Sequence, residues 1–529
     1  MKVLLIGIDA LDCQLIERFA SDLPTLTALR TSGTALNVRS TFPPDSDTAW
    51  ATIMTGLNPA QHGIVRFVDP LEKSYQILNV GSRNDMLRGK TFWDLLGRAG
   101  YKAHAIFPHL GYPIWPTPGV IVARGSAVSD VQASPRSVLD EYPNPATIGG
   151  LRGMPGRGLA AMRSYAQALH NQALLDAEFA LKLMRKHDWD LFFVYFSTLD
   201  AVGHFFWNYF DPEDPGYAVH HPLARVIPET YGLYDAIVGR FLDAAGDGVS
   251  VIVMSDHGHG GRPFRLVNIN EVLRKGGFLR AHDLTANPHI DLFEKSKRLA
   301  VKTVSRYGLG RLAGQIMRGF PRVVQSFTRP ASVDWDRTIA YASDMSGIKS
   351  YPYGGIIINR QALGGSDYEI VRDEIIDLVR KDCVLLDGRQ LVRFVARRED
   401  LYSGPFISNY PDIVLELEYG YGVGWAVNVP LITDAASHNL VPGSHRGETG
   451  TFLMRSPRST AAHTETVDLR DVLPTILDLV GVPQTRSFEG QSILTNACVH
   501  CGRRARASSR PVAIGKNGGV PNGRSGGGQ

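Results

Sequence analysis

The sequence predicts an α/β fold with three layers, in which helices cover both faces of a mostly parallel central sheet. Short apolar runs of strand length alternate along the chain with longer segments of helical periodicity, and this order is typical of consecutive βαβ units. The apolar runs at residues 1–8, 191–199 and 249–254 are nearly unbroken, as expected for parallel strands that are buried on both faces.

The other elements continue this alternation in chain order. Pro24 divides the helical segment 11–32, because a proline either ends a helix or occupies its first turn. A helix-like stretch at 48–54 leads into the turn-forming residues 55–59. We expect further helices at 91–98, 158–186, 231–245 and 468–481, and further strands at 102–107 and 355–359.

The pattern changes between residues 261 and 350, where we expect an inserted, mainly helical cap. Residues 295–329 contain nine Lys or Arg and no acid, interleaved with apolar residues. This composition fits a helix pair with a solvated basic face, and also a basic lid over an anionic substrate or a membrane-surface contact. The catalytic α/β domain is then discontinuous, 1–260 and 351–494, and the Arg-, Gly- and Ser-rich segment 495–529 is expected to be a disordered tail.

The composition is that of a soluble globular protein, with 44% hydrophobic and 20% charged residues. The net charge of +4 includes six positive charges in 498–529, so the rest of the chain carries −2 and gives no electrostatic reason to expect a nucleic acid partner. Four cysteines are too few for a disulfide scaffold. No signal peptide and no apolar run of about 18 residues is present, so we expect a cytoplasmic protein without a transmembrane segment.

Carboxylate and imidazole side chains follow the three most apolar strands. The residues concerned are Asp9, Asp200 with His204, and Asp256 with His257. Ligand sites in open parallel sheets form outside the carboxyl ends of strands, so these side chains are expected to converge. Asp and His are the ligands that zinc and similar ions prefer. Asp200 and His204 would face the same side of a helical turn, and His445, in a late Gly-Ser-His segment, supplies one more imidazole.

Such a set of ligands indicates a two-metal hydrolytic centre. Two ions about 4 Å apart can clamp the attacking and leaving oxygens of a phosphoryl transfer, and they also activate a neighbouring hydroxyl as a nucleophile. The segment 40–50 offers Thr41, Ser46 and Thr48. A hydroxyl at the start of the helix-like stretch would face the positive end of the helix dipole. Spacing alone does not separate the three hydroxyls.

The same positions resemble the alkaline phosphatase superfamily, specifically its type I phosphodiesterase/nucleotide pyrophosphatase branch. The matching stretches occur in the family's order and are Gly7-Ile8-Asp9-Ala10, Ser46 to Trp50 with Thr55-Gly56-Leu57-Asn58-Pro59, Gln61-His62-Gly63-Ile64, Asp200 with Gly203-His204, Ser255-Asp256-His257-Gly258 and Gly443-Ser444-His445. The final helix is also similar to that of the family. The resemblance covers nearly all of residues 1–494 and implies an alkaline-phosphatase-like fold.

The resemblance implies two divalent cations, with Zn²⁺ expected and Mn²⁺ as the alternative. The side chains it assigns to them are Asp200, His204 and His445 at one site, and Asp9, Asp256 and His257 at the other. Counting back from Thr55-Gly56 places Ser46 at the position of the family's nucleophile, which would also bridge toward the ion pair. The implied mechanism is a double displacement through a covalent phospho-enzyme on Ser46.

Two departures from the family pattern are Ser46, where the family usually has a Thr, and Phe67, and the first is chemically tolerable. Nucleotide pyrophosphatases carry an Asn shortly after the His-Gly-Ile stretch, where this chain has Phe67 beside Arg66, and we expect Arg66 to be exposed and solvated. The sulfatase motif is absent at 46–50. His259 is a candidate for substrate contact or proton transfer.

The sequence therefore predicts a metal-dependent hydrolase of small-molecule phosphate esters, first of all a phosphodiesterase. The alternatives are a phosphomonoesterase, a phosphonate hydrolase, a phosphoryl-transfer enzyme of the same superfamily, or a catalytically silent protein that binds a phosphorylated ligand. The sequence identifies neither the natural substrate nor the oligomeric state.

Overall fold

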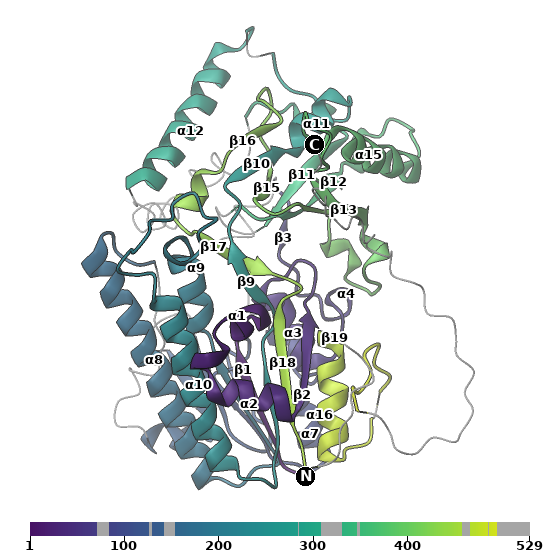
Figure 1. Ribbon diagram of the computed structural model, residues 1–529. Helices are drawn as coiled ribbons and strands as arrows, with labels where there is room; N and C mark the ends of the chain where they lie inside the picture. The colour runs from purple at the N-terminus through teal and green to yellow at the C-terminus, as the bar shows by residue number, and fades with distance from the viewer. Residues whose placement is uncertain are drawn as a thin grey trace, which may run out of the picture. The chain divides into compact units, whose positions relative to one another are not determined.

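A nine-stranded sheet carries the elements that hold the predicted site residues (Figure 1). In this computed structural model β1 (Val3–Ile8) is the middle strand and lies parallel to β7 (Leu191–Phe196) and β8 (Ser250–Met254). β4 (Ala103–Ile106) continues the parallel set beside β7. The outer strands are β2 (Thr34–Arg39), β5 (Ile121–Arg124), β6 (Val131–Ser134), β18 (Gly450–Arg455) and β19 (Thr466–Asp468), in the order β19-β2-β18-β8-β1-β7-β4-β5-β6. The predicted mostly parallel sheet is confirmed.

The structure describes residues 1–70, 84–125, 130–141, 154–283, 285–307, 331–345, 350–457, 466–484 and 486–494. Met1 to Leu494 form one compact unit. The expected disordered tail at 495–529 lies outside the described residues. No helix among the described residues is long and apolar enough to cross a membrane.

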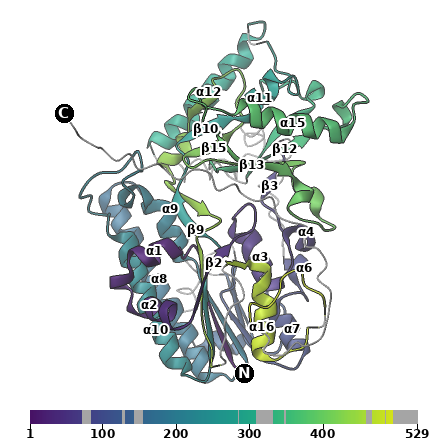
Figure 2. The same ribbon diagram turned by 45° about the vertical axis from the view of Figure 1, so that its right-hand side comes forward.

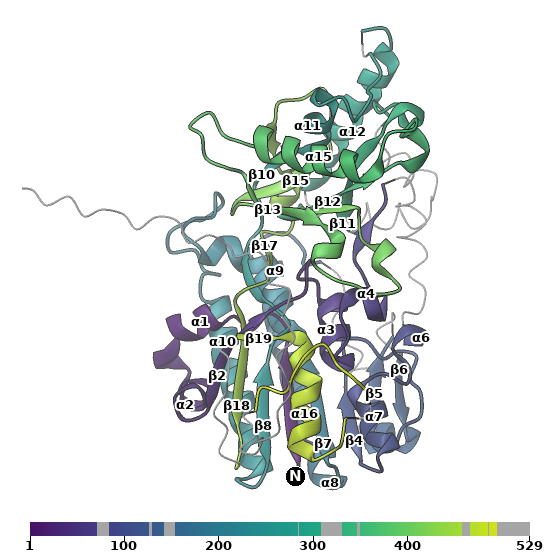
Figure 3. The same ribbon diagram turned by 90° about the vertical axis from the view of Figure 1, so that its right-hand side faces the viewer.

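Helices cover both faces of the nine-stranded sheet, as predicted (Figures 1 and 3). Successive residues of β1 show this, because Leu4 and Ile6 belong to one apolar core while Val3 and Leu5 belong to another. The first core is closed by α1 (Cys13–Arg18), α2 (Pro24–Ser32), α8 (Leu159–Lys186), α9 (Thr198–Phe210) and α10 (Val226–Ala245), and the second by α3 (Ser46–Thr55), α7 (Phe92–Arg98) and α16 (Val472–Val480).

Prolines lie in the first turns of two helices. Pro24 is the first residue of α2, where its missing N–H costs no hydrogen bond. α10 begins at Val226 rather than at the predicted residue 231. Pro228 lies within the first turn of α10, where a proline is tolerated, so it does not delay the start of the helix.

A second set of sheets packs around its own core, which extends from Val267 to Val427 (Figure 2). A five-stranded sheet has the order β13-β14-β12-β11-β3, and a three-stranded sheet has the order β15-β10-β16. Their strands are β3 (Phe67–Val68), β10 (Arg265–Asn268), β11 (Ala340–Met345), β12 (Tyr353–Ile358), β13 (Val392–Arg397), β14 (Ile413–Leu417), β15 (Tyr421–Gly424) and β16 (Ile432–Asp434). Their helices include α11 (Ile269–Lys275), α12 (Pro288–Tyr307) and α15 (Tyr368–Asp382).

Within the cap expected at 261–350, the described residues are mainly helical but also include two short strands. α12 is helical, but β10 and β11 are strands. β12, from the part assigned to the catalytic domain, pairs with β11 and β14 rather than with the nine-stranded sheet. β10 and β11 contain only four and six residues, which is too little sequence to show a period, so the pattern did not reveal them. Residues 308–330 of the basic segment lie outside the described residues.

Candidate active site

The predicted site residues come together outside the carboxyl ends of β1, β7 and β8. Asp9 follows β1, and its backbone N–H donates to the carbonyl of Phe196 at the end of β7, 2.9 Å away. Asp200 and His204 lie one turn apart on α9, as predicted. Asp256 and His257 occupy the sharp connection between β8 and β9 (Gly258–Gly261). His445 lies on β17 (Gly443–Arg446), which pairs with β9 in an antiparallel ribbon.

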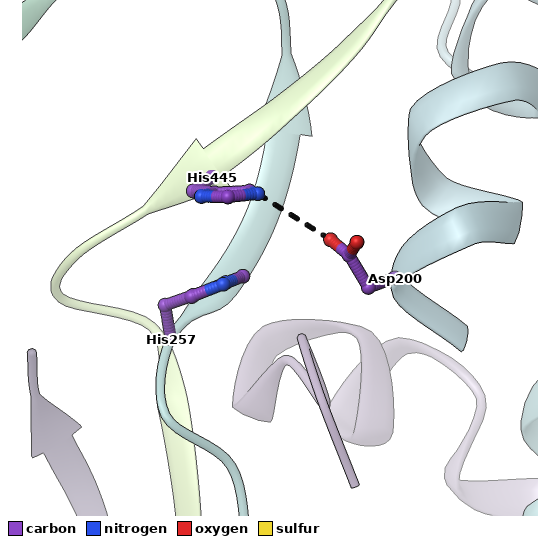
Figure 4. A group of neighbouring side chains, drawn as sticks. All are labelled: Asp200, His257 and His445. Atoms are coloured by element: carbon purple, nitrogen blue, oxygen red, sulfur yellow. Dashed lines mark ion pairs between the residues drawn. The ribbon is translucent and has the colours of Figure 1, made fainter. Parts of the chain in front are cut away.

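Asp200, His204 and His445 form one group of donors, called here the Asp200 cluster. Oδ1 of Asp200 lies 3.4 Å from Nε2 of His204 and 3.5 Å from Nε2 of His445. The two Nε2 atoms are 3.0 Å apart. Figure 4 shows His445 and Asp200 pointing toward each other from the ribbon and from α9. These are the three residues assigned to one ion by the sequence resemblance.

Backbone carbonyls fix the protonation of both imidazoles in the Asp200 cluster. Nδ1 of His204 lies 3.0 Å from the carbonyl oxygen of Gly443, and Nδ1 of His445 lies 2.6 Å from that of Pro44. A carbonyl oxygen only accepts, so each Nδ1 must carry the hydrogen. Each Nε2 is then left with a lone pair directed into the cluster, which is the arrangement of metal-binding histidines.

Asp9, Asp256 and His257 form the second group of donors, called here the Asp9 cluster. Nε2 of His257 lies 3.4 Å from Oδ1 of Asp9 and 3.2 Å from Oδ2 of Asp256. Nδ1 of His257 donates to the carbonyl of Gly258, 2.9 Å away, so its Nε2 also presents a lone pair. The ring of His257 stacks on that of His445 with centroids 3.9 Å apart, so the two clusters adjoin (Figure 4).

The Asp9 cluster concentrates negative charge where water is excluded. Asp256 is completely buried and Asp9 is 2% exposed. Burial, followed by the charge of Asp9, raises the pKa of Asp256 well above its ordinary value. Oδ2 of Asp256 accepts no hydrogen bond from the residues that the structure describes. Two buried carboxylates with an unused oxygen are stabilised by a cation, so this donor set fits a divalent metal ion.

Ser46 is the candidate hydroxyl that contacts the Asp9 cluster. It is the first residue of α3, and the helix cap is Asp45, whose carboxylate accepts from the N–H of Asp47. Ser46 is thus released from capping. Its Oγ lies 3.2 Å from Nε2 of His257 and 3.4 Å from Oδ1 of Asp9.

The other two candidate hydroxyls are placed differently. Thr41 donates to the carbonyl of Pro43, and Thr48 is completely buried within α3. The geometry therefore favours Ser46 over Thr41 and Thr48.

A hydrogen-bonded network that the sequence did not reveal supports the Asp9 cluster. The hydroxyl of Tyr195 donates to Oδ2 of Asp9. Burial and then the charge of Asp9 raise the pKa of Tyr195 well above its ordinary value, so it remains a donor. Nδ1 of His109 lies 2.8 Å from the Tyr195 oxygen, and its Nε2 lies 2.8 Å from Oδ1 of Asp47. Burial lowers the pKa of His109, but the hydrogen bond and charge of Asp47, with the charges of Asp9 and Asp256, raise it to about 9.

Arg66 is held in place rather than solvated, so that expectation was wrong. Its Nε lies 3.2 Å from Oδ2 of Asp45, and its Nη1 lies 3.0 Å from Oδ2 of Asp47. These carboxylates flank Ser46 in the chain, and the start of α3 turns both toward the guanidinium. Phe67, at the position of the family's Asn, packs its ring 6.3 Å from Phe42 and offers no polar group.

Comparison with known proteins gives matches at the level of family and structure. The family described as type I phosphodiesterase / nucleotide pyrophosphatase matches residues 3–319. The structure is similar to human and murine ectonucleotide pyrophosphatase / phosphodiesterase 5, each at 14% identity, TM-score 0.47, and coverage of 94% of this chain and 100% of that chain. An inactive variant of the murine protein in complex with AMP matches over the same shares at 14% identity and TM-score 0.46. No curated protein matches the sequence.

The family match extends over more than half of the chain and includes the residues that supply Asp9, Ser46, Asp200 and Asp256. The order of these residues along the chain and their convergence at one edge of the parallel sheet agree with that match. The chain belongs to the type I phosphodiesterase/nucleotide pyrophosphatase family of phosphoester hydrolases, a branch of the alkaline phosphatase superfamily.

Proposed function

We propose that this protein is a metal-dependent phosphodiesterase in which Ser46 is the nucleophile. One observation carries the proposal: the hydroxyl of Ser46 contacts the Asp9 cluster, 3.2 Å from Nε2 of His257 and 3.4 Å from Oδ1 of Asp9, and the ring of His257 stacks on that of His445 in the Asp200 cluster. A serine at the first position of a ten-residue helix also lies at the positive end of the helix dipole, which favours an incoming phosphoryl group.

The donor chemistry of both clusters fits divalent cations, with zinc as the first expectation and manganese as the alternative. Asp200, His204 and His445 would hold one ion. Asp9, Asp256 and His257 would hold the other, and this set includes the unused oxygen of Asp256. When bound, such a pair of cations supplies Lewis acidity, which lowers the pKa of a nearby hydroxyl and offsets negative charge on the leaving oxygen.

The residues of this chain then account for a double displacement. The Oγ of Ser46 attacks phosphorus and forms a covalent phospho-enzyme as the ester oxygen departs. Attack of water on the same phosphorus releases the phosphate product and restores the serine. Tyr195 holds the carboxylate of Asp9 through its hydroxyl, so the side chain next to Ser46 keeps one orientation throughout.

A phosphomonoesterase is the second candidate, and Arg66 is the observation that favours it. The guanidinium bridges Asp45 and Asp47, the two residues that flank Ser46 in the chain, so a fixed positive charge is held at the start of the helix that carries the proposed nucleophile. A monoester brings one more negative charge than a diester, and a neighbouring guanidinium compensates it. Phe67 cannot make the hydrogen bond of the family's Asn, which leaves nucleotide pyrophosphatase specificity without that contact.

The test is hydrolysis of a generic aryl phosphodiester and of the matching monoester, each with Zn²⁺ or Mn²⁺. We expect a diester preference in the wild type, loss of about 10⁴-fold or more in kcat for Ser46→Ala, and retained turnover for the conservative control Ser46→Thr. Metal content, measured on the same samples, should be equal in all three proteins.

Other outcomes would redirect the proposal. A monoester preference that also depends on Ser46 would move the protein to the phosphatase side of the superfamily. Bound metal with no turnover of either ester would indicate a silent binder of a phosphorylated ligand, and full activity in Ser46→Ala would exclude this serine as the nucleophile.

A further inference from the structure

His259 is a buried imidazole beside the Asp200 cluster. It lies on β9 directly opposite His445 of β17 in the antiparallel ribbon. Directly opposed residues of an antiparallel pair project to the same face, so the two imidazoles leave the ribbon on the same side. Nδ1 of His259 reaches to 3.7 Å from Oδ1 of Asp200. His259 is therefore positioned by the same ribbon that positions a predicted metal ligand.

Neither ring nitrogen of His259 has a hydrogen-bond partner among the described residues. The side chain is 3% exposed, so bulk water does not supply one. The backbone is satisfied, because the N–H of His259 donates to Oδ2 of Asp12, 3.1 Å away. Leaving a buried polar group unpaired is unfavourable, so such a group in a native structure calls for an explanation.

The spacing of the donors around Asp200 fits a metal ion. Three imidazole nitrogens surround Oδ1 of Asp200, with Nε2 of His204 at 3.4 Å, Nε2 of His445 at 3.5 Å and Nδ1 of His259 at 3.7 Å. Metal–ligand bonds of 2.0–2.1 Å in a tetrahedral zinc site place the donors about 3.3–3.4 Å from one another. The three distances from Asp200 are close to the donor–donor distance of a zinc site. Side chains that only form hydrogen bonds to a common partner are not restricted to this distance.

Two glycines build the space that this ring occupies. A Cβ at Gly203 would lie 2.7 Å from three ring atoms of His259, and a Cβ at Gly443 would lie 2.6 Å from its Nε2. Gly203 is on α9, between Asp200 and His204, and Gly443 begins β17. Both elements that carry the predicted ligands are thus kept free of side chains where the His259 ring packs.

We propose that His259 is a fourth protein ligand of the ion held by the Asp200 cluster. The inference rests on the proposed function, because it assumes that the cluster binds a divalent cation. It gives that ion three nitrogen donors and one oxygen donor, whereas the Asp9 cluster offers one nitrogen and two oxygens. A nitrogen-rich set prefers Zn²⁺ or Co²⁺, and an oxygen-rich set accepts Mn²⁺ more readily, so the two sites bind different ions with different affinity.

The test is a Co²⁺ titration of the full-length chain after removal of metal with a chelator, followed by visible absorption and by the number of ions bound. We expect two Co²⁺ per chain in the wild type. In His259→Phe we expect the affinity for the tighter ion to fall by about 100-fold, and the absorption spectrum to change. A residue that only hydrogen-bonds to a metal ligand typically contributes about 10–100-fold, so this loss lies at or beyond that upper limit. The second ion should bind as before.

His104→Phe is the matched control. His104 is also buried, and its two ring nitrogens also lack a hydrogen-bond partner among the described residues. It lies on β4, with its ring beside Phe192 and His187 rather than beside the clusters. If the loss of any buried imidazole weakened Co²⁺ binding, both variants would bind Co²⁺ more weakly. If His259 is a ligand, only His259→Phe should bind Co²⁺ more weakly.

X-ray absorption of the wild type at one equivalent of Zn²⁺ covers the case in which His259→Phe fails to fold. Three imidazoles at the zinc support the inference and two overturn it. Wild-type affinity and spectrum in a folded His259→Phe also overturn it while leaving the proposed function in place. A wild type that binds no Co²⁺ and no Zn²⁺ overturns both.

Discussion

The Asp200 cluster and the Asp9 cluster adjoin, but they are built from different elements and different donors. Helix α9 and the β9–β17 ribbon supply the Asp200 cluster, in which imidazoles predominate. The ends of β1 and β8 supply the Asp9 cluster, in which carboxylates predominate. Each cluster has its own supports, namely the carbonyls of Pro44 and Gly443 for one and Tyr195 for the other. Because the supports are separate, we expect that a substitution can perturb one cluster and leave the other in place.

The largest effect is expected when a carboxylate is neutralised. Asp256→Asn neutralises the completely buried carboxylate of the Asp9 cluster, and we expect kcat/KM to fall by about 10³-fold or more, about 4 kcal/mol of transition-state stabilisation. One of two ions should be lost, as measured by elemental analysis. Asp200→Asn should be equally inactive but should lose the ion of the Asp200 cluster instead. In a sample loaded with both zinc and manganese, we expect the lost ion to be zinc.

If both variants lost both ions, the two clusters would form a single cooperative site and the comparison would fail. If Asp256→Asn kept two ions together with full activity, its carboxylate would have no role in metal binding.

An intermediate effect is expected for Tyr195→Phe, which removes only the hydroxyl that donates to Asp9. Loss of an outer partner of a metal ligand costs about 10–100-fold in metal affinity or activity. We expect that loss for the ion of the Asp9 cluster and wild-type affinity for the other, measured by calorimetric titration of metal-free protein. Tyr234→Phe is a suitable control, because Tyr234 is a similarly buried tyrosine whose hydroxyl bonds to Thr198 instead. Equal losses at both sites would show that Tyr195 stabilises the fold rather than the Asp9 cluster.

The sequence predicted one part of this centre because ordinary sheet geometry applies there. Nearly unbroken apolar runs ending in Asp9, Asp200 and Asp256 mark parallel strands, and the carboxyl ends of such strands converge. The spacing of Asp200 and His204 needed only a helical turn, which α9 provides. The roles of these residues as metal ligands remain predictions.

The rest depended on tertiary contacts that no local pattern records. His109 follows the predicted strand at 102–107, so the strand-end argument applied to that strand would have found it. Tyr195 lies within an apolar strand and therefore resembles an ordinary core residue in the sequence. Arg66 is paired with carboxylates about twenty positions away. The pairing of His259 with His445 requires the ribbon between β9 and β17, which joins segments far apart in the chain.

The smallest effect on the centre is expected at His62, a histidine that serves the scaffold. It is completely buried, and both ring nitrogens are engaged: Nδ1 accepts from the N–H of Ile64, and Nε2 bonds to the hydroxyl of Thr52. Burial, followed by the charge of Lys90, lowers the pKa of His62 to about 3. A lowered folded-state pKa means that its stabilisation is present above the unfolded value of about 6.5 and is lost as the pH falls toward 3.

We therefore expect His62→Gln to leave metal content and turnover at pH 7 unchanged and to lower the free energy of unfolding there by about 1–2 kcal/mol. Glutamine cannot take up a proton, so the stability of the variant should fall less steeply between pH 6.5 and pH 4, by up to about 1.4 kcal/mol per pH unit for the missing proton. Urea unfolding at several pH values measures both quantities. If the free energy of unfolding depended on pH in the same way in both proteins, the fold would not hold His62 neutral. If the variant lost a metal ion, His62 would contribute to metal binding like the histidines of the two clusters.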